Sequence, residues 1–197
     1  MPNDLEPRAN DANPYDRAQV AQLLAGADAA VNLFAYLREG LARDADCGLL
    51  TALVYDFDDM TSCRVFSEDR AAYPVGNFKA LVPGPYFERV VKPRQHWASV
   101  DLAGVAELFF DWEKIRDLGY ESSLNIPAVV NDTLIGTVNL LAVRGTYQPA
   151  KVEAALRWQP IINLCFLLLN QPAGRAASFH ADVTDLPKGK VETLRSV

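Results

Sequence analysis

The side chains best suited to hold a small molecule lie in two consecutive segments with the pattern of β-strands, Glu121–Val130 and Leu134–Val143. Successive side chains of a strand point to opposite faces, so each segment has one wholly apolar face and one face that carries polar groups. The polar groups are hydroxyls and amides: Ser123, Asn125, Thr137 and Asn139. A few such groups within apolar walls can orient a ligand, although they can also bond to one another across the strands.

Arg64, in an earlier predicted strand, is the leading single candidate for binding an anion. A guanidinium on a half-buried strand can hold a carboxylate or another oxyanion through two parallel hydrogen bonds. The alternative is a salt bridge between Arg64 and Glu68, or between Arg64 and another acid nearby. The sequence supports both interpretations.

Catalysis and metal binding have less support. Nucleophilic catalysis needs a Cys or Ser beside a positioned His. Cys63 precedes Arg64 and should lie on the opposite, apolar face, and Cys165 lies in an almost wholly apolar segment, so both are expected to pack as small hydrophobic residues. The two histidines, His96 and His180, are too few for a histidine-rich metal site, and the sequence has no glycine-rich phosphate loop. We therefore expect no enzyme activity, no metal and no cofactor.

Periodicity and turn residues predict the elements that position these side chains. Residues Tyr73–Val91 are rich in Pro and Gly and are predicted to be irregular, with a short helix from Pro85. Asp16 and Gly119 suit a helix start and a helix end, and Pro160 should kink the last helix. The other predicted elements are helix Arg17–Arg43, strands Gly48–Phe57, Ser62–Glu68 and His96–Val100, helix Val105–Leu118, the hairpin described above, and helix Ala150–Asn170.

This order of elements predicts an α+β fold, because adjacent strands joined by short turns pair in antiparallel fashion. The chain of 197 residues is long enough for one domain with a full core, expected at residues 16–170. Residues 1–15 are rich in Asn, Asp and Pro and are expected to be a disordered arm. Residues 171–197 are expected to be a loosely ordered tail.

The hairpin also resembles that of a known family. The residues SSLNIP at 122–127 and LIGTVNL at 134–140, followed at once by a long helix, are similar to the signature hairpin of GAF domains. The order of elements along residues 18–169 is similar to that family as well. The resemblance implies a GAF/PAS-like antiparallel sheet of about five to six strands, with the terminal helices on one face. On the other face it implies a ligand pocket beneath the irregular segment.

The resemblance implies a function too. A GAF-like domain of this kind is expected to bind a small organic or anionic ligand and to signal its occupancy through a partner or a dimer rearrangement. The alternative from another class is an interaction or scaffold protein with a vestigial pocket. A GAF-type enzyme, such as a free methionine sulfoxide reductase, is the third possibility.

The implied pocket would lie between the polar face of the hairpin and the irregular segment. Arg64 and the four polar residues of the hairpin would orient the ligand. Aromatic side chains would form its walls: Tyr55, Phe66, Phe78, Tyr86, Trp97, Phe110 and Trp112. Aromatic residues also fill ordinary cores, so each of these positions has a purely structural alternative.

Three better-defined branches of the family fit poorly. The branch that reduces free methionine sulfoxide has cysteines clustered around its pocket, and phytochrome-like domains attach a bilin through a pocket cysteine. The irregular segment of this chain contains no cysteine. Cyclic-nucleotide-binding GAF domains carry an Asn-Lys-Phe-Asp-Glu motif, which the residues NFK at 77–79 do not match.

Charge and composition restrict the partners. The formal net charge is −6, and acidic and basic residues are interspersed without a basic cluster, which argues against direct binding of nucleic acid. The N-terminus lacks a signal-peptide pattern and no apolar run is long enough to span a bilayer, so a cytoplasmic location without membrane contact is expected. Three cysteines, far apart and odd in number, do not suggest a disulfide framework.

A homodimer through the helices Arg17–Arg43 and Ala150–Asn170 is also expected. Residues 161–169 are apolar nearly all round, and a helix that is hydrophobic on every side must be buried on every side. GAF domains commonly pair through these two helices, as the resemblance adds. Alternatively the tail, with Phe179 and Leu186, folds back and covers the same surface within one chain.

Overall fold

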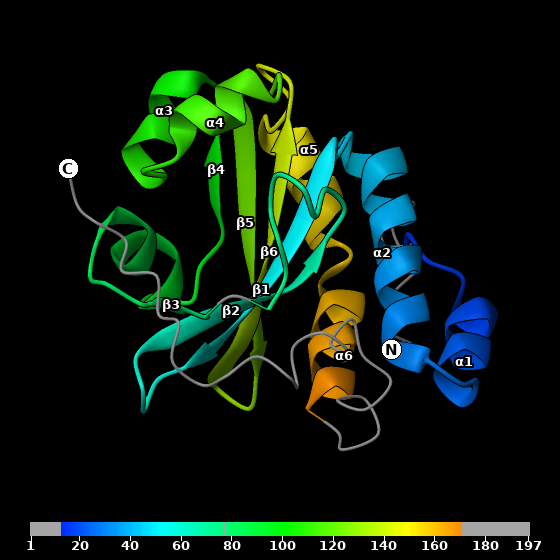
Figure 1. Cartoon of the computed structure of the whole chain (residues 1–197). Helices are drawn as coiled ribbons and strands as arrows, with labels where there is room; N and C mark the ends of the chain where they lie inside the picture. The colour runs from blue at the N-terminus through cyan, green and yellow to red at the C-terminus, as the bar shows by residue number, and fades with distance from the viewer. Residues whose placement is uncertain (1–12, 77, 171–197) are drawn as a thin grey trace, which may run out of the picture.

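The computed structural model describes residues 13–76 and 78–170, and a six-stranded antiparallel sheet forms its centre. The strand order is β3-β2-β1-β6-β5-β4, so the β1–β2 and β5–β6 hairpins lie side by side (Figure 1). The strands are β1 (Leu49–Asp56), β2 (Thr61–Ser67), β3 (Phe78–Ala80), β4 (Trp97–Ser99), β5 (Ser122–Val130) and β6 (Thr133–Ala142). The predicted α+β fold with an antiparallel sheet is confirmed.

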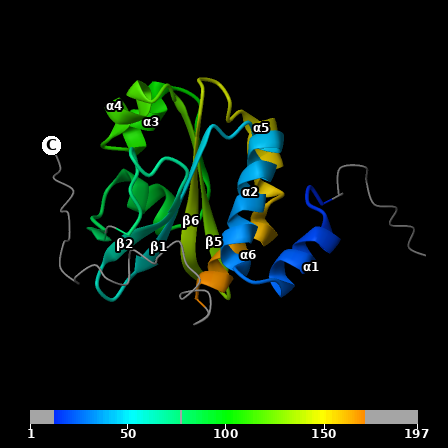
Figure 2. The ribbon, with the colours of Figure 1, turned by 45° about the vertical axis from the view of Figure 1, so that its right-hand side comes forward.

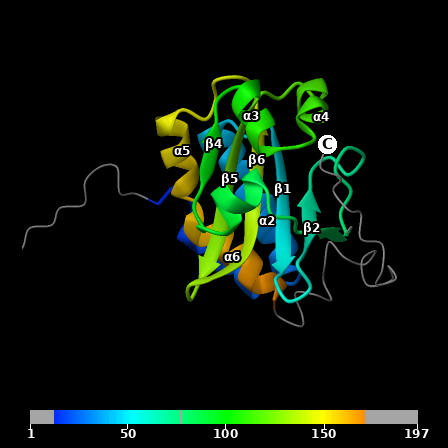
Figure 3. The ribbon, with the colours of Figure 1, turned by 90° about the vertical axis from the view of Figure 1, so that its left-hand side faces the viewer.

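Helices lie on both sides of this sheet. The first two and the last two helices form a layer against one face (Figures 1 and 2), and the short helices lie on the opposite side (Figure 3). The layer consists of α1 (Arg17–Ala25), α2 (Ala29–Ala45), α5 (Pro149–Leu156) and α6 (Gln159–Leu169). The short helices are η1 (Phe87–Val91), α3 (Leu102–Leu108) and α4 (Trp112–Asp117).

The apolar faces of the β5–β6 hairpin form the main core together with the helix layer, as the alternation predicts. Leu124, Ile126, Val138 and Leu140 of the hairpin are fully buried. They belong to one cluster with side chains of α2 and α6: Leu33, Phe34, Leu37, Ile162 and Phe166. The other face of the hairpin is therefore free to carry the polar side chains.

Two glycines let the helix layer approach closely. A Cβ atom at Gly136 of β6 would lie 2.2 Å from the ring of Phe166 in α6. A Cβ atom at Gly40 of α2 would lie 2.1 Å from the ring of Trp158, which is fully buried between α5 and α6. Either distance is an overlap of atoms, so each ring occupies space that only glycine leaves open.

Three predicted helices are each broken in two, and this corrects the sequence-based boundaries. The helix predicted over Arg17–Arg43 ends where Gly26 is extended and resumes after Asp28, whose φ of 54° is left-handed. The helix predicted over Val105–Leu118 is interrupted where Phe109 is extended between α3 and α4. The kink predicted in the last helix is present, since α5 and α6 are bent by 47°. Apolar periodicity continues through such breaks and does not reveal them.

The segment predicted to be irregular contains a short strand that the sequence pattern missed. Strand β3 pairs with β2, with Ala80 opposite Thr61 and Phe78 opposite Cys63. Three residues are too few for a visible alternation, so only the pairing with β2 defines this strand. The short helix predicted from Pro85 is present and continues into η1.

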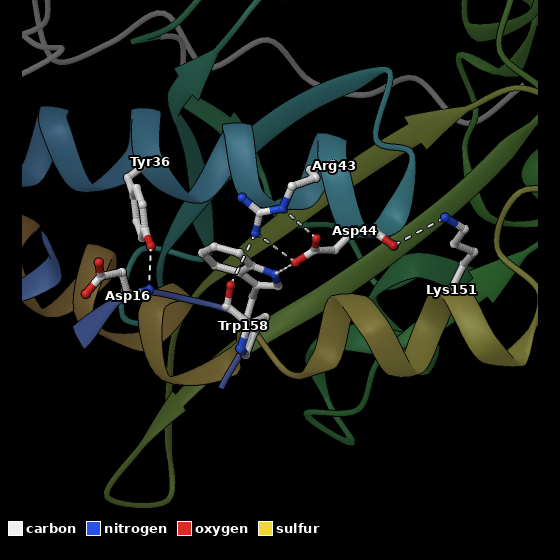
Figure 4. Close-up of polar contacts among 7 residues, drawn as sticks. Asp16, Tyr36, Arg43, Asp44, Lys151 and Trp158 are labelled. Carbon is white, nitrogen blue, oxygen red and sulfur yellow. Dashed lines mark hydrogen bonds and ion pairs between the residues drawn. The ribbon is translucent and has the colours of Figure 1, made fainter. Parts of the chain in front are cut away.

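Residues 13–16 are held against α2 and the α5–α6 junction (Figure 4). The guanidinium of Arg43 donates to the carbonyl oxygen of Pro14 over 3.2 Å and to the carboxylate of Asp44. The indole nitrogen of Trp158 donates to the same carboxylate over 3.0 Å. Residues 13–15, the end of the predicted disordered arm, are thus packed in place.

The remainder of that arm, residues 1–12, and the predicted tail, residues 171–197, lie outside the described residues. No single helix in the described ranges has the length and apolar character needed to cross a membrane. The bent pair of α5 and α6 reaches that length and character only when both helices are counted together.

The outer edge of β5 is covered by side chains along its second half. Strand β4 pairs with β5 only as far as Asn125. Beyond that point, Gln159 of α6 donates to the carbonyl oxygen of Pro127 over 3.0 Å, and Asn163 donates to that of Val129 over 3.2 Å. An open groove of about 280 Å³ lies along this edge between α6 and the residues that precede β4.

The contact between β6 and α6 can be tested by filling the space at Gly136. The Gly136→Ala protein should be roughly 1–3 kcal/mol less stable in urea unfolding, because the added Cβ would overlap the ring of Phe166. The control is Gly84→Ala, where the nearest atom to the added Cβ is 3.9 Å away and the expected change is within about 0.5 kcal/mol. Equal stability of the two variants would contradict the close approach.

Candidate functional site

A row of buried polar side chains crosses the sheet on the face opposite the helix layer. Ser67, Thr51, Asn139 and Asn125 are directly paired positions on β2, β1, β6 and β5, and none is more than 7% exposed. Directly paired side chains share a face, and the residues on either side of Asn139 in β6 belong to the core beneath the helices. These four side chains, called the polar row below, are therefore neighbours. Trp97 of β4 is paired with Asn125 and lies at the end of the row.

Three polar atoms without partners gather at one end of this face. Ser99 of β4 is paired directly with Ser123 of β5, and neither hydroxyl has a hydrogen-bond partner among residues 13–76 and 78–170. Asn125 donates weakly to the carbonyl oxygen of Trp97 over 3.4 Å, and its own Oδ1 has no partner. Ser99, Ser123 and Asn125, called the serine–asparagine corner below, are at most 5% exposed. A buried polar group without a partner costs about 1–3 kcal/mol, so this corner is unusual within a folded domain.

Two tyrosine hydroxyls satisfy the polar groups further along β6. The hydroxyl of Thr137 lies 2.8 Å from that of Tyr55 and 3.0 Å from that of Tyr86. The hydroxyl of Tyr86 donates to Oδ1 of Asn139 over 2.9 Å. Each hydroxyl has one proton, so a chain running from Tyr55 through Thr137 and Tyr86 to Asn139 uses every donor once. Burial raises the pKa of both tyrosines, which therefore keep their protons at neutral pH.

The position of Tyr86 explains how the segment before β4 is attached to the sheet. Tyr86 immediately precedes η1, and its ring also contacts Phe109 at a centroid distance of 5.8 Å. Helix η1 lies over the face of β5 and β6 (Figure 3). The predicted location of Thr137 and Asn139 beneath this segment is confirmed, and both side chains are already hydrogen-bonded there.

Arg64 does not form the salt bridge with Glu68 that the sequence left open. Glu68 instead pairs with Arg38 of α2 and accepts a hydrogen bond of 2.6 Å from the backbone N–H of Leu50. The guanidinium of Arg64 donates through one terminal nitrogen to the carbonyl oxygen of Pro74 over 3.1 Å, and its buried Nε has no partner. Burial lowers the pKa of Arg64.

Phe66 lies on the wrong face for the predicted pocket, and this corrects its assignment as a wall residue. Its ring stacks on Phe34 of α2 at a centroid distance of 5.4 Å, within the helix-side core. Simple alternation would place Phe66 on the same face as Arg64. The pairing of β1 with β2 shifts by one residue at this point, since Ala52 is opposite Phe66 whereas Leu53 is opposite Arg64. Such a bulge reverses the faces beyond it.

The remaining aromatic candidates do not form one set of walls. Phe78 and Phe110 are 43% and 63% exposed, so they do not form buried walls. Trp97 lies beneath the guanidinium of Arg89 at 4.6 Å, and Trp112 packs beside Tyr73 in a small cluster under α3 and α4. Of the predicted site residues, the structure brings together Tyr55, Tyr86, Thr137 and Asn139, and it places Ser123 and Asn125 beside Trp97.

Sequence reasoning missed four polar residues of this face: Ser67, Thr51, Ser99 and Tyr73. Thr51 and Ser67 lie in correctly predicted strands, but their place in the polar row depends on the pairing of strands that are distant in sequence. The buried hydroxyl of Tyr73 has no partner, and the ring lies 4.9 Å from the guanidinium carbon of Arg64. A row of small polar residues within apolar strands was the available signal.

The cysteines are free and buried at Cys47, Cys63 and Cys165. Burial raises the pKa of the Cys63 thiol to about 11 and that of Cys47 to about 12, and it raises the pKa of Cys165 as well. Thiols of this kind carry almost no reactive thiolate at neutral pH. Within residues 13–76 and 78–170, no group of three or more His, Cys, Asp or Glu side chains is placed to hold a metal ion.

Comparison with known proteins gives matches among solved structures alone, since no family model and no curated protein sequence matches this chain. The GAF domain of a two-component sensor histidine kinase from Bacillus halodurans matches with a TM-score of 0.56 and 11% identity, over 69% of this chain and 92% of that one. A GAF domain/HD domain protein from Geobacter sulfurreducens matches with a TM-score of 0.56 and 15% identity, over 80% and 97% of the two chains.

A third similar structure is an enzyme. The free methionine-R-sulfoxide reductase from Neisseria meningitidis, solved with its substrate, matches with a TM-score of 0.56 and 12% identity, over 81% of this chain and 88% of that one. At such low identities these likenesses establish the fold. Together with the sheet order and the two-sided helix arrangement, they mean that this chain has a GAF-like fold.

Proposed function

We propose that this chain is a small-molecule-binding sensory or regulatory domain whose ligand lies against the sheet face opposite the helix layer. One observation carries the proposal. The described residues contain six buried side-chain N or O atoms without a hydrogen-bond partner. Five of them lie on this face: Arg64 Nε, Tyr73 OH, Ser99 Oγ, Ser123 Oγ and Asn125 Oδ1.

The energetic argument follows from that clustering. Each such atom loses its hydrogen bonds to water on folding and gains nothing in return, at a cost of about 1–3 kcal/mol. A ligand with polar atoms at the right positions recovers part of this cost, and the gain appears as affinity. The similar structures agree with such a role, since two of them are named as GAF domains or GAF-domain proteins and one was solved with a bound substrate.

Binding rather than catalysis fits the available groups. The three thiols are buried and held in their protonated form by desolvation. His96 is exposed, and no nucleophile on the polar face has a hydrogen-bonded histidine as its base in the described ranges. The polar face thus offers donors and acceptors for recognition.

Native mass spectrometry of the purified full chain tests the proposal directly. We expect a population that carries a small molecule, lost on denaturation, because buried groups without partners favour a ligand that satisfies them. Ser123→Ala and Asn125→Leu should reduce the bound fraction at least about tenfold, since each removes a buried hydrogen-bonding group. Thr133→Ala, at an exposed position in the hairpin turn, is the control and should bind normally. A chain that is empty, and that no small-molecule extract stabilises against heat, would contradict the proposal.

The hydrogen bonds that attach η1 to the sheet offer a way for the domain to signal that its ligand is bound. Tyr86 holds the start of η1 to Thr137 and Asn139, and a ligand that competes for these groups would release the helix. Removing the hydroxyl should imitate that release. In Tyr86→Phe we expect the amides of Phe87–Val91 to exchange hydrogen at least about tenfold faster, as loss of roughly 1–2 kcal/mol of hydrogen bonding would give.

Tyr120→Phe serves as the control for that experiment. Its hydroxyl donates over 3.2 Å to the carbonyl oxygen of Gly48, which lies outside η1. It should leave exchange at residues 87–91 unchanged. Unaltered exchange in Tyr86→Phe as well would argue against Tyr86 as the attachment.

We further propose a homodimer through the helix layer. Leu24 of α1 and Leu167 of α6 are each 36% exposed, and Leu164 and Leu168 are only partly buried. Light scattering at micromolar concentration should give twice the 21.7 kDa mass of the chain. Leu167→Glu should halve that mass without unfolding the protein, because the side chain is already exposed in one chain. A monomeric mass for the unmodified protein would overturn the dimer and leave the tail as the alternative cover.

A further inference from the structure

We propose that the ligand of this domain carries a carboxylate, and that Arg64, Tyr73 and Lys114 bind that group at the β2 end of the polar face. These three residues are called the arginine end below. The inference rests on the proposed function, since it names the chemical class of the ligand that would occupy the same face. Its basis is a buried guanidinium Nε and a buried tyrosine hydroxyl, neither of which makes a hydrogen bond of normal geometry to a described residue.

The orientation of Arg64 is already set. One terminal nitrogen is held by the carbonyl oxygen of Pro74 at 3.1 Å, and the guanidinium carbon lies 4.9 Å from the centroid of the Tyr73 ring. The bond to Pro74 leaves Nε without a partner, although it is buried. A guanidinium that is held at one terminal nitrogen and unpaired at Nε can bind a planar carboxylate through two parallel hydrogen bonds.

Tyr73 adds a second donor beside that edge. The residue is 6% exposed, and its hydroxyl makes no hydrogen bond of normal geometry within the described residues, although the carboxylate of Asp111 lies close enough to act on it. Burial and the nearby charge of Asp111 raise the pKa of Tyr73, so the hydroxyl remains protonated and able to donate. Two cations lie against the same ring, since the Lys114 ammonium is 4.5 Å from its centroid. An anion bound here would meet positive charge from two elements, β2 and α4.

The balance of charge selects the kind of anion. Arg64 and Lys114 are positive, and neither forms an ion pair within 4.0 Å among the described residues. Asp111 acts on both Arg64 and Tyr73, and Asp69 acts more weakly on Tyr73. These carboxylates partly offset the two cations. A single negative charge is therefore favoured over a dianion such as phosphate.

The arginine end lies within reach of the rest of the polar face. Arg64 is opposite Leu53 of β1, which is opposite Thr137 of β6. Neighbouring strands are about 4.8 Å apart, so Arg64 and Thr137 are separated by roughly 10 Å at the backbone. A molecule of a few carbon atoms could thus place its carboxylate at Arg64 and its polar groups against the polar row.

The test is a titration of the full chain followed by NMR of the arginine Nε–H groups and the asparagine side-chain amides. The probes are butyrate, butyramide, which has the same shape without the charge, and inorganic phosphate. We expect butyrate to shift the Nε–H resonance of Arg64, butyramide to leave it unchanged, and phosphate to bind more weakly than butyrate. Arg64→Gln should raise the Kd for butyrate at least about tenfold, as loss of a charged hydrogen-bonding pair would give.

Matched variants separate this role from a structural one. Arg116→Gln is the control, because Arg116 also lies over an aromatic ring, that of Trp112 at 5.5 Å, yet is exposed and paired with Asp117. It should leave the Kd unchanged. If Arg64→Gln does not fold, Lys114→Gln takes its place, since that side chain is exposed, and it should weaken butyrate roughly threefold through loss of one nearby charge.

The outcomes distinguish the two levels of the proposal. Equal binding of butyrate and butyramide, with no effect of Arg64→Gln, would overturn the carboxylate and leave the proposed function standing. Phosphate binding more tightly than butyrate would overturn the preference for a single charge. If native mass spectrometry also finds the chain empty and no probe shifts either Arg64 or the amide of Asn125, both the inference and the proposed function fail.

Discussion

The contact of Phe166 with Gly136 is the constraint on which the arrangement of this domain depends. The ring fills the space that a side chain at 136 would need, so α6 can lie directly on β6. Phe166 also meets Phe34 edge to face at 5.6 Å, and Phe34 stacks on Phe66 at 5.4 Å. This column of rings joins α6, α2 and β2. Because the helices pack on this face of the sheet through these rings, the polar side chains lie on the other face.

The polar face is unusual because it is buried and yet carries polar side chains. The sheet face is as buried as an ordinary core, but hydroxyls and amides occupy its central row. The tyrosines satisfy Thr137 and Asn139, whereas three oxygen atoms of the serine–asparagine corner and the Nε of Arg64 have no partner among the described residues. The domain thus accepts a local loss of stability at defined atoms. Proteins concentrate such losses where they bind other molecules, because binding recovers them.

The sequence was most informative where structure is local. The β5–β6 hairpin, its turn and its two faces follow from alternation and from Asn131 and Asp132, both of which have positive φ. The bulge that sends Phe66 to the helix side has no such signature, because it arises from pairing with β1. Pairing also brings Ser99 to Ser123, although they are 24 positions apart in the sequence. The two faces of the hairpin could therefore be predicted from local pattern, whereas features that depend on the pairing of distant strands, such as the bulge and the contact of Ser99 with Ser123, could not.

Pro127 has a consequence for how this sheet meets other chains. A free strand edge usually offers a row of N–H and C=O groups onto which a foreign strand can add. At the outer edge of β5, Pro127 has no N–H, and Gln159 and Asn163 already occupy the carbonyl oxygens of Pro127 and Val129. The edge is thereby closed to strand addition along its exposed half. This removes one stretch of open strand edge onto which another chain could otherwise add.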